Sequence, residues 1–176
     1  MGCITCGVLY SLNMALDPFV SFLPPQSVGK VGKTIEFLGQ GFTGTTKVSF
    51  SGTAANFTVV SDAYLTAAVP NGAKTGFVTV TAPGRKLVSS RIFRVTPQII
   101  AFDPPSGPIG TPVTITGISL AQTKTVAFGG VKATAVTVDS DTEVSVTVPS
   151  GAKTGRIQVT TSGGSAISSS NFIVTP

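Results

Sequence analysis

The sequence predicts an all-β chain of two immunoglobulin-like β-sandwiches placed end to end, and two observations lead to this prediction. The first is an internal repeat: residues 72–76 (GAKTG) recur letter for letter at 151–155, an offset of 151 − 72 = 79 residues. The second is a series of short alternating segments separated by turn residues. About seven short strands in a repeat of roughly 80 residues are typical of such a sandwich. We therefore expect one domain at 18–97, a second at 98–176, and an N-terminal segment at 1–17 that belongs to neither.

The expected strands occur in matched pairs, one in each repeat. Val78 and Val80 alternate with polar residues in the segment 77–81, which places both valines on one side of a half-buried strand. Other matched segments with this pattern are 35–37 and 113–116, 47–50 and 125–128, and 63–69 and 142–148. No segment shows the sustained stripe of a helix. Matched phenylalanines fall at inward positions and are expected to be buried: Phe50 with Phe128, and Phe93 with Phe172.

Charge is sparse and unevenly distributed. Charged residues make up 11% of the chain, and the net charge is +5. Residues 18–97 carry eight bases against two acids, 8 − 2 = +6, whereas the four bases and four acids of residues 98–176 cancel. The excess therefore belongs to the surface of one domain, where a basic patch is suited to an acidic polymer or simply faces solvent. The residues of this predicted patch are Arg85, Lys86, Arg91 and Arg94.

The sequence lacks the usual patterns of catalytic and metal-binding residues. The chain has no histidine, which excludes the common nucleophilic triads, and we expect no enzyme activity, cofactor or metal site. Residues 29–34 (GKVGKT) imitate part of a phosphate-binding loop, but a strand is predicted where such a loop needs a helix. Asp139, Asp141 and Glu143 are predicted on one strand face, where a solvated surface is a better interpretation than a weak calcium site.

The N-terminal segment is apolar and contains no charge before Asp17. We expect this segment to form a strand that adds to an exposed sheet edge, either of its own chain or of another copy. The residues of this predicted strand are Val8, Leu9, Tyr10 and Leu12. Cys3 and Cys6 are interpreted as a disulfide, local or between chains, or as two idle thiols. No export signal and no stretch of about 18 apolar residues is visible, so we expect a processed or truncated chain without a membrane span.

The second repeat resembles the IPT/TIG domain, an immunoglobulin-like family shared with plexins and certain transcription factors. The resemblance rests on residues 100–110 (IAFDPPSGPIG), 113–117 (VTITG) and 126–131 (VAFGGV), and residues 19–97 follow the same pattern more loosely. These are turn and core residues, so the resemblance implies a fold but no chemistry. It also implies an accessory module of a secreted or surface bacterial protein. Residues 7–12 are similar to the last strand of a short bacterial tandem repeat that often precedes such domains.

Taken with this resemblance, the composition favours a non-catalytic structural, adhesive or self-assembling module from outside the cell or its surface. Its expected partners are other protein chains or copies of itself. The alternative is an accessory carbohydrate-binding module of a polysaccharide-active protein. Sugar sites usually need exposed aromatic rings, and the phenylalanines that remain available for one are Phe19, Phe57 and Phe77, which lack an aromatic counterpart in the other repeat. Nucleic acid is not an expected partner, because the base-reading loops of the transcription-factor relatives are not matched.

Overall fold

The computed structural model describes residues 17–23 and 27–176. Within these ranges the chain forms eighteen strands, and no helix there is long and apolar enough to cross a membrane. The predicted N-terminal strand and the pair Cys3 and Cys6 lie outside the described residues, so strand addition and the disulfide stay predictions.

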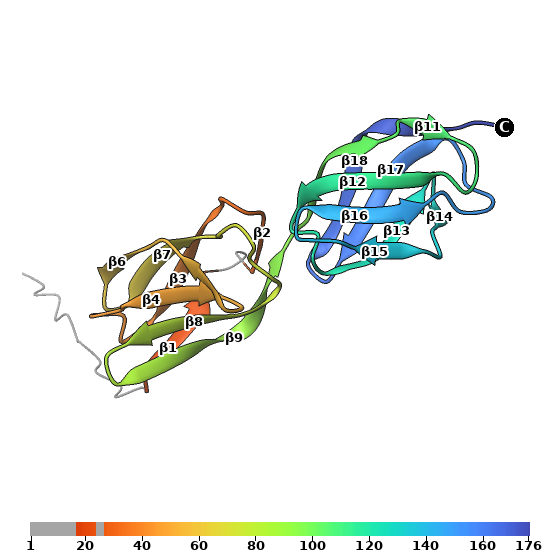
Figure 1. Cartoon of the computed structure of the whole chain (residues 1–176). Helices are drawn as coiled ribbons and strands as arrows, with labels where there is room; N and C mark the ends of the chain where they lie inside the picture. The colour runs from red at the N-terminus through yellow and green to blue at the C-terminus, as the bar shows by residue number, and fades with distance from the viewer. Residues whose placement is uncertain (1–16, 24–26) are drawn as a thin grey trace, which may run out of the picture.

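The first half of the chain forms two sheets that together make one sandwich (Figure 1). The four-stranded sheet has the order β1-β3-β7-β6, and the five-stranded sheet has the order β2-β9-β8-β4-β5, in which only β2 and β9 run parallel. The strands of the first sheet are β1 (Phe19–Phe22), β3 (Thr34–Gln40), β7 (Tyr64–Ala68) and β6 (Phe57–Ser61). Those of the second are β2 (Val28–Gly29), β9 (Arg85–Val95), β8 (Gly76–Ala82), β4 (Lys47–Phe50) and β5 (Thr53–Ala55).

The second half repeats this arrangement strand for strand, with the orders β10-β12-β16-β15 and β11-β18-β17-β13-β14. Its four-stranded sheet consists of β10 (Gln98–Asp103), β12 (Pro112–Ile118), β16 (Glu143–Thr147) and β15 (Val136–Val138). Its five-stranded sheet consists of β11 (Ser106–Gly107), β18 (Gly164–Val174), β17 (Gly155–Thr161), β13 (Thr123–Phe128) and β14 (Val131–Lys132). The predicted fold class, two all-β sandwiches, is confirmed.

Each sandwich has its own core, built around a pair of phenylalanine rings. The ring centroids of Phe50 and Phe93 are 5.1 Å apart, and those of Phe128 and Phe172 are also 5.1 Å apart, both pairs edge to face. All four rings are at most 1% exposed, which confirms the inward positions predicted for them. Such a geometry adds roughly 0.5–1.5 kcal/mol to what burial of the rings contributes. Valine and isoleucine side chains from the facing sheets surround the rings.

A buried serine supports an irregularity in the last long strand of each sandwich. The ladder between β8 and β9 is interrupted opposite Val78, where residues 89–91 bulge out of β9. The Ser89 hydroxyl accepts a hydrogen bond from the Val78 N–H at 3.0 Å and donates one to the Arg91 carbonyl at 2.7 Å. Ser168 makes the equivalent pair of hydrogen bonds in β18. Because a buried backbone group without a partner costs about 1–3 kcal/mol, the hydroxyl makes the bulge possible inside the sandwich.

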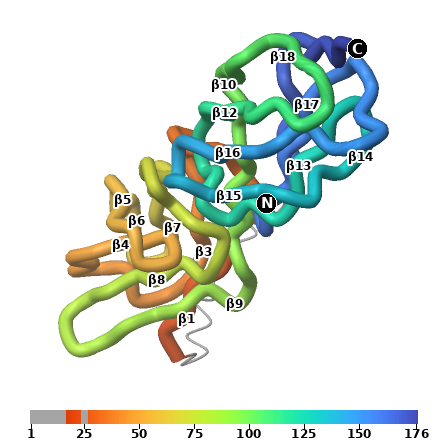
Figure 2. Tube along the Cα trace, turned by 45° about the vertical axis from the view of Figure 1, so that its right-hand side comes forward, coloured from red at the N-terminus to blue at the C-terminus, as the bar shows by residue number. Residues whose placement is uncertain are grey.

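The two sandwiches follow one another, and only residues 96–97 separate β9 of the first from β10 of the second (Figures 1 and 2). Gln122 of the second sandwich binds both backbone groups of Thr75 in the first. Its Oε1 accepts from the Thr75 N–H at 2.8 Å, and its Nε2 donates to the Thr75 carbonyl at 3.4 Å. Gly163 lies so close to Val95 that a Cβ there would collide with the Val95 carbonyl oxygen. The joint is therefore held by these contacts as well as by the short connection.

Replacing Phe128 with Ala should lower the free energy of unfolding of the second sandwich by about 3–5 kcal/mol, because a fully buried ring is lost and a cavity remains. Phe77→Ala is the matched control. Its ring is 50% exposed, so the loss should be about 0.5 kcal/mol. Chemical denaturation measures both changes, and equal losses in the two variants would contradict the assigned register.

Replacing Gln122 with Ala should widen the range of angles between the sandwiches, because both hydrogen bonds to Thr75 are removed. Small-angle scattering of the full chain measures the change. Gln158→Ala, at an exposed position of the same sandwich, should leave the scattering profile unaltered. If both variants scatter like the parent chain, the short connection alone fixes the joint.

Candidate functional site

The bulge in β9 determines which side chains reach the outer face of the five-stranded sheet. Leu87, Phe93 and Val95 point inward along β9, and the same alternation assigns an inward place to Arg91. Arg91 is exposed instead, because residues 89–91 leave the regular ladder. Redirecting a side chain in this way is a frequent effect of β-bulges.

Arg91 borders a shallow hollow of about 410 Å³ on this outer face, which we call the Phe77 hollow. Phe77 of β8 pairs in register with Ile92 of β9, and both side chains are exposed. They form the apolar part of the hollow, and serine and arginine residues complete its lining. The lining residues are Ser27, Phe77, Ser90, Arg91, Ile92 and Arg94.

The lining of the Phe77 hollow combines two apolar side chains with two positively charged ones. Phe77 is 50% exposed and Ile92 is 41% exposed. Arg91 and Arg94 stand on either side of Ile92 in β9, and within the described part of the chain neither has an ion-pair partner. A guanidinium group stays charged at every physiological pH. Within the described residues, the hollow therefore combines a half-exposed aromatic ring with two positive charges that have no ion-pair partner.

The second sandwich has the same bulge but a different surface over it. Arg156 stands where the first sandwich has Phe77, and its Nη1 donates a hydrogen bond to the Ser168 carbonyl at 3.1 Å. Ser170 stands where the first sandwich has Arg91. The combination of an exposed ring with arginines thus belongs to the first sandwich, although the backbone beneath it is common to both.

The structure divides the predicted basic patch into two parts. All four residues belong to β9, but its first two residues lie roughly 16 Å along the strand from Arg91. The Arg85 guanidinium lies against Gly41, near the carboxylate of Asp62. Arg91 and Arg94 form the other part, beside the Phe77 ring. The sequence indicated both the charges and the unmatched ring, but only the pairing of β8 with β9 brings them together.

The other rings that the sequence left unmatched are placed differently. Phe57 is half-buried against the first core, so its ring takes part in packing. Phe19 is 45% exposed, on the edge strand β1 of the other sheet. Loss of solvent around the Tyr64 hydroxyl, together with its hydrogen bond to the Glu36 carboxylate, raises the pKa of Tyr64. Among these rings, Phe77 is the one that lies in a hollow bordered by arginines.

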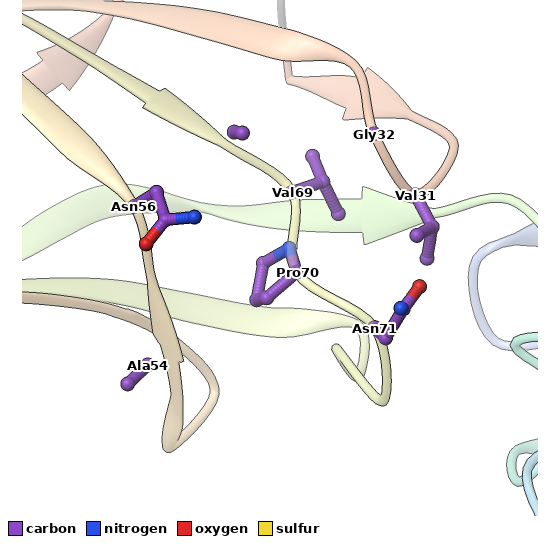
Figure 3. A pocket seen from close by; sticks show the side chains of 8 residues that line it. Val31, Gly32, Ala54, Asn56, Val69, Pro70 and Asn71 are labelled. Carbon is purple, nitrogen blue, oxygen red and sulfur yellow. The ribbon is translucent and has the colours of Figure 1, made fainter.

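A second hollow, of about 290 Å³, opens near the end of the first sandwich (Figure 3). Val31, Val69 and Pro70 supply apolar atoms, and Asn56 and Asn71 stand on opposite sides of Pro70. Its lining contains neither an aromatic ring nor a charged group. It offers little to orient a ligand compared with the Phe77 hollow.

The stretch that imitates a phosphate-binding loop has a structural role. Residues 30–33 form a turn that leads into β3, as the sequence predicted, and the Lys33 N–H donates to the Lys30 carbonyl at 3.1 Å. The Lys33 ammonium group donates to the Val28 carbonyl at 3.3 Å. The lysine thus binds the backbone of its own turn.

The prediction that Asp139, Asp141 and Glu143 share a strand face is wrong. The two aspartates lie in the turn between β15 and β16, and only Glu143 belongs to a strand. The turn forms there because the Ser140 hydroxyl accepts a hydrogen bond from the Thr142 N–H at 3.1 Å. The described residues contain no group of three side chains able to hold a metal ion.

The duplicated topology agrees with a single family of domains. The sequence profile of the IPT/TIG domain matches residues 19–92 and, separately, residues 97–174. The chain belongs to the IPT/TIG domain family. The resemblance noted in the sequence is thereby confirmed, and the two sandwiches are tandem TIG domains. A search of curated proteins finds no match to this chain.

Solved structures similar to the two TIG domains come from bacterial surface proteins and from plexins. The surface glycan-binding protein PbSGBP-B of Prevotella bryantii is 18% identical, with a TM-score of 0.56 over 88% of this chain and 41% of that chain. SGBP-B from a xyloglucan utilization locus of Bacteroides uniformis is 19% identical, with a TM-score of 0.41 over 90% and 50%. The extracellular region of plexin A4 is 17% identical, with a TM-score of 0.43 over 97% and 20%. The chain spans half the length of these proteins or less, and at these identities the likeness concerns the fold.

In the first TIG domain, Asp62 fixes the corner between β3 and β4. Its two carboxylate oxygens accept hydrogen bonds from the Gly41 and Thr43 N–H groups, each at 3.0 Å. The Thr43 hydroxyl first, and then these two N–H groups, hold the pKa of Asp62 below its usual value of 3.8. In the second TIG domain Asp141 accepts from the Ala121 N–H at 3.3 Å. The two aspartates that the repeat matches are thus corner residues.

Replacing Asp62 with Asn should lower the melting temperature of the first TIG domain at neutral pH, and the difference from the parent chain should fade in acid. Because the folded-state pKa of Asp62 lies below its unfolded value, the carboxylate stabilises the fold above the unfolded pKa. That stabilisation is lost as the pH falls through the folded pKa. Thermal melts over this range measure the difference.

The control for this experiment is Asp139→Asn, at an exposed position of the second TIG domain. This variant should have the same melting temperature as the parent chain at every pH. An Asp62→Asn variant that is destabilised by the same amount at neutral and at strongly acidic pH would contradict the assigned role of the carboxylate.

Proposed function

We propose that this chain is a non-catalytic module of a cell-surface glycan-binding protein and that its first TIG domain contacts carbohydrate at the Phe77 hollow. The observation that carries the proposal is the half-exposed Phe77 ring in an open hollow between serine and arginine side chains. An aromatic face packs well against the C–H side of a sugar ring, and the neighbouring donors suit sugar oxygens. A volume of about 410 Å³ lies in the range of small-ligand sites.

The comparison with solved structures supports this choice and the surface location. PbSGBP-B shares the fold of this chain and is, by its name, a surface glycan-binding protein. The sequence alone placed a structural or self-assembling module first and sugar binding second. We now favour sugar binding, because the Phe77 hollow supplies a contact surface and PbSGBP-B, which shares the fold, is named as a glycan-binding protein.

A second role, that of a spacer, is favoured by the joint between the TIG domains. Gln122 and the close approach of Gly163 to Val95 restrict bending there. A linker of two residues gives the domains little freedom of their own. A stiff pair of this kind would hold the Phe77 hollow at a set distance from the second TIG domain.

Replacing Phe77 with Ala should weaken glycan binding about tenfold, because the aromatic face is lost while the fold is kept. Binding is measured first on a glycan array with the full chain, and then by calorimetry with the strongest ligand. Phe19→Ala is the matched control, since this ring is similarly exposed on the opposite sheet of the same domain. The proposal fails if the array gives no ligand, or if the two variants bind alike.

A further inference from the structure

We propose that the Phe77 hollow selects acidic polysaccharides, those that carry carboxylate or sulfate groups on their sugars. This inference rests on the proposed function and adds the chemical class of the glycan. Three properties of the hollow support it: the kind of hydrogen-bonding groups it offers, the charge around it, and the order of those groups along β9.

The polar groups that line the hollow are mainly donors. Arg91 and Arg94 supply guanidinium N–H groups, which can only donate, and Ser27 and Ser90 supply hydroxyls, which donate and accept. Among the described residues, no carboxylate or carboxamide side chain is part of this lining. The hydroxyls of a neutral sugar need both donors and acceptors, whereas a sugar carboxylate or sulfate only accepts. The lining therefore matches an anion better than a neutral sugar.

The two strands that carry the hollow contain no acid to offset the charge of its two arginines. Residues 18–97 contain two acids, and neither lies in β8 or β9. Asp62 holds the corner where Arg85 lies, and Glu36 accepts a hydrogen bond from Tyr64 on the opposite sheet. Screening acts over about 8 Å at physiological ionic strength, so the charges of the arginines act on a ligand that reaches the hollow.

The ring and the charges follow one another along β9. The pair of Phe77 and Ile92 supplies the apolar side chains, Arg91 directly precedes Ile92, and Arg94 lies about 7 Å beyond Ile92 along the strand. A saccharide chain lying along β9 would place one sugar on the Phe77 ring and bring its anionic groups to the guanidinium groups. The planar guanidinium can bind a carboxylate or a sulfate through two parallel hydrogen bonds.

The equivalent surface of the second TIG domain lacks these properties. Arg156 occupies the position of Phe77, and its guanidinium is already bound to the Ser168 carbonyl. Across the second domain, residues 98–176, bases and acids are equal in number. The second domain therefore serves as an internal control, because charge removed there should not affect the ligand.

The test measures binding of the full chain to polygalacturonate and to the same polymer after its carboxylates have been reduced to alcohols. Dextran sulfate and dextran form a second pair that tests sulfate. We expect an acidic polymer to bind about tenfold or more tightly than its neutral partner, and to bind more weakly as salt is added. The variant R91A/R94A should lose this preference. The variant K124A/K132A, which removes the same charge from exposed positions of the second domain, should keep it.

The outcomes distinguish this inference from the proposed function. If the neutral polymers bind as tightly as the acidic ones, or if R91A/R94A binds like the parent chain, acidic selectivity is overturned while glycan binding stands. If polyglutamate binds equally well and Phe77→Ala has no effect on acidic polymers, the attraction is non-specific and the inference also fails. If neither these polymers nor a glycan array gives a ligand, both proposals fail. Binding of one acidic polymer and not the other supports the inference and identifies the anion.

Discussion

Both TIG domains depend on a serine hydroxyl buried at a break in their last long strand. Without Ser89 and Ser168, the amide opposite each bulge would lose its partner inside a dry sandwich. With them, the strand can leave the ladder, expose three consecutive residues (90–92 or 169–171) and pair again with its neighbour at residue 92 or 171. The same strand then carries Phe93 or Phe172 into the core. A small polar contact thus reconciles a continuous hydrophobic core with an irregular outer surface.

The two domains share this scaffold and differ where nothing in the scaffold constrains the side chain. The ring pairs, the buried serines and the corner aspartates recur at matching positions, because each satisfies a packing or hydrogen-bonding need of the fold. The side chains on the outer surface beside the bulge meet no packing or hydrogen-bonding need of the fold. Phe77 and Arg91 in one copy, and Arg156 and Ser170 in the other, are compatible with the same backbone. Candidate binding surfaces in duplicated domains are therefore best sought where the copies disagree.

The sequence predicted the fold well and the site poorly, for physical reasons. Alternation of apolar residues and matched phenylalanines depend on local periodicity, so the strands and the buried Phe50 and Phe128 could be foreseen. The four residues of the basic patch could be predicted, but not their separation into two groups. The position of Arg91 depends on a bulge that the alternation of apolar and polar residues does not reveal. Gln122 gave no signal apart from replacing Gly44 in the repeat, since contacts between domains leave no periodic pattern.

Gln122 recognises the first TIG domain through main-chain atoms, and this affects how the pair can change during evolution. An N–H and a carbonyl are the same for every residue that could occupy position 75, proline excepted, because proline lacks the N–H. Mutations of that side chain leave the contact with Gln122 available, whereas loss of Gln122 abolishes it. The Gln122 contact therefore depends on one side chain alone, while the Thr75 side chain has a separate role in its own domain, where its hydroxyl accepts a hydrogen bond from the Val95 N–H at 3.0 Å.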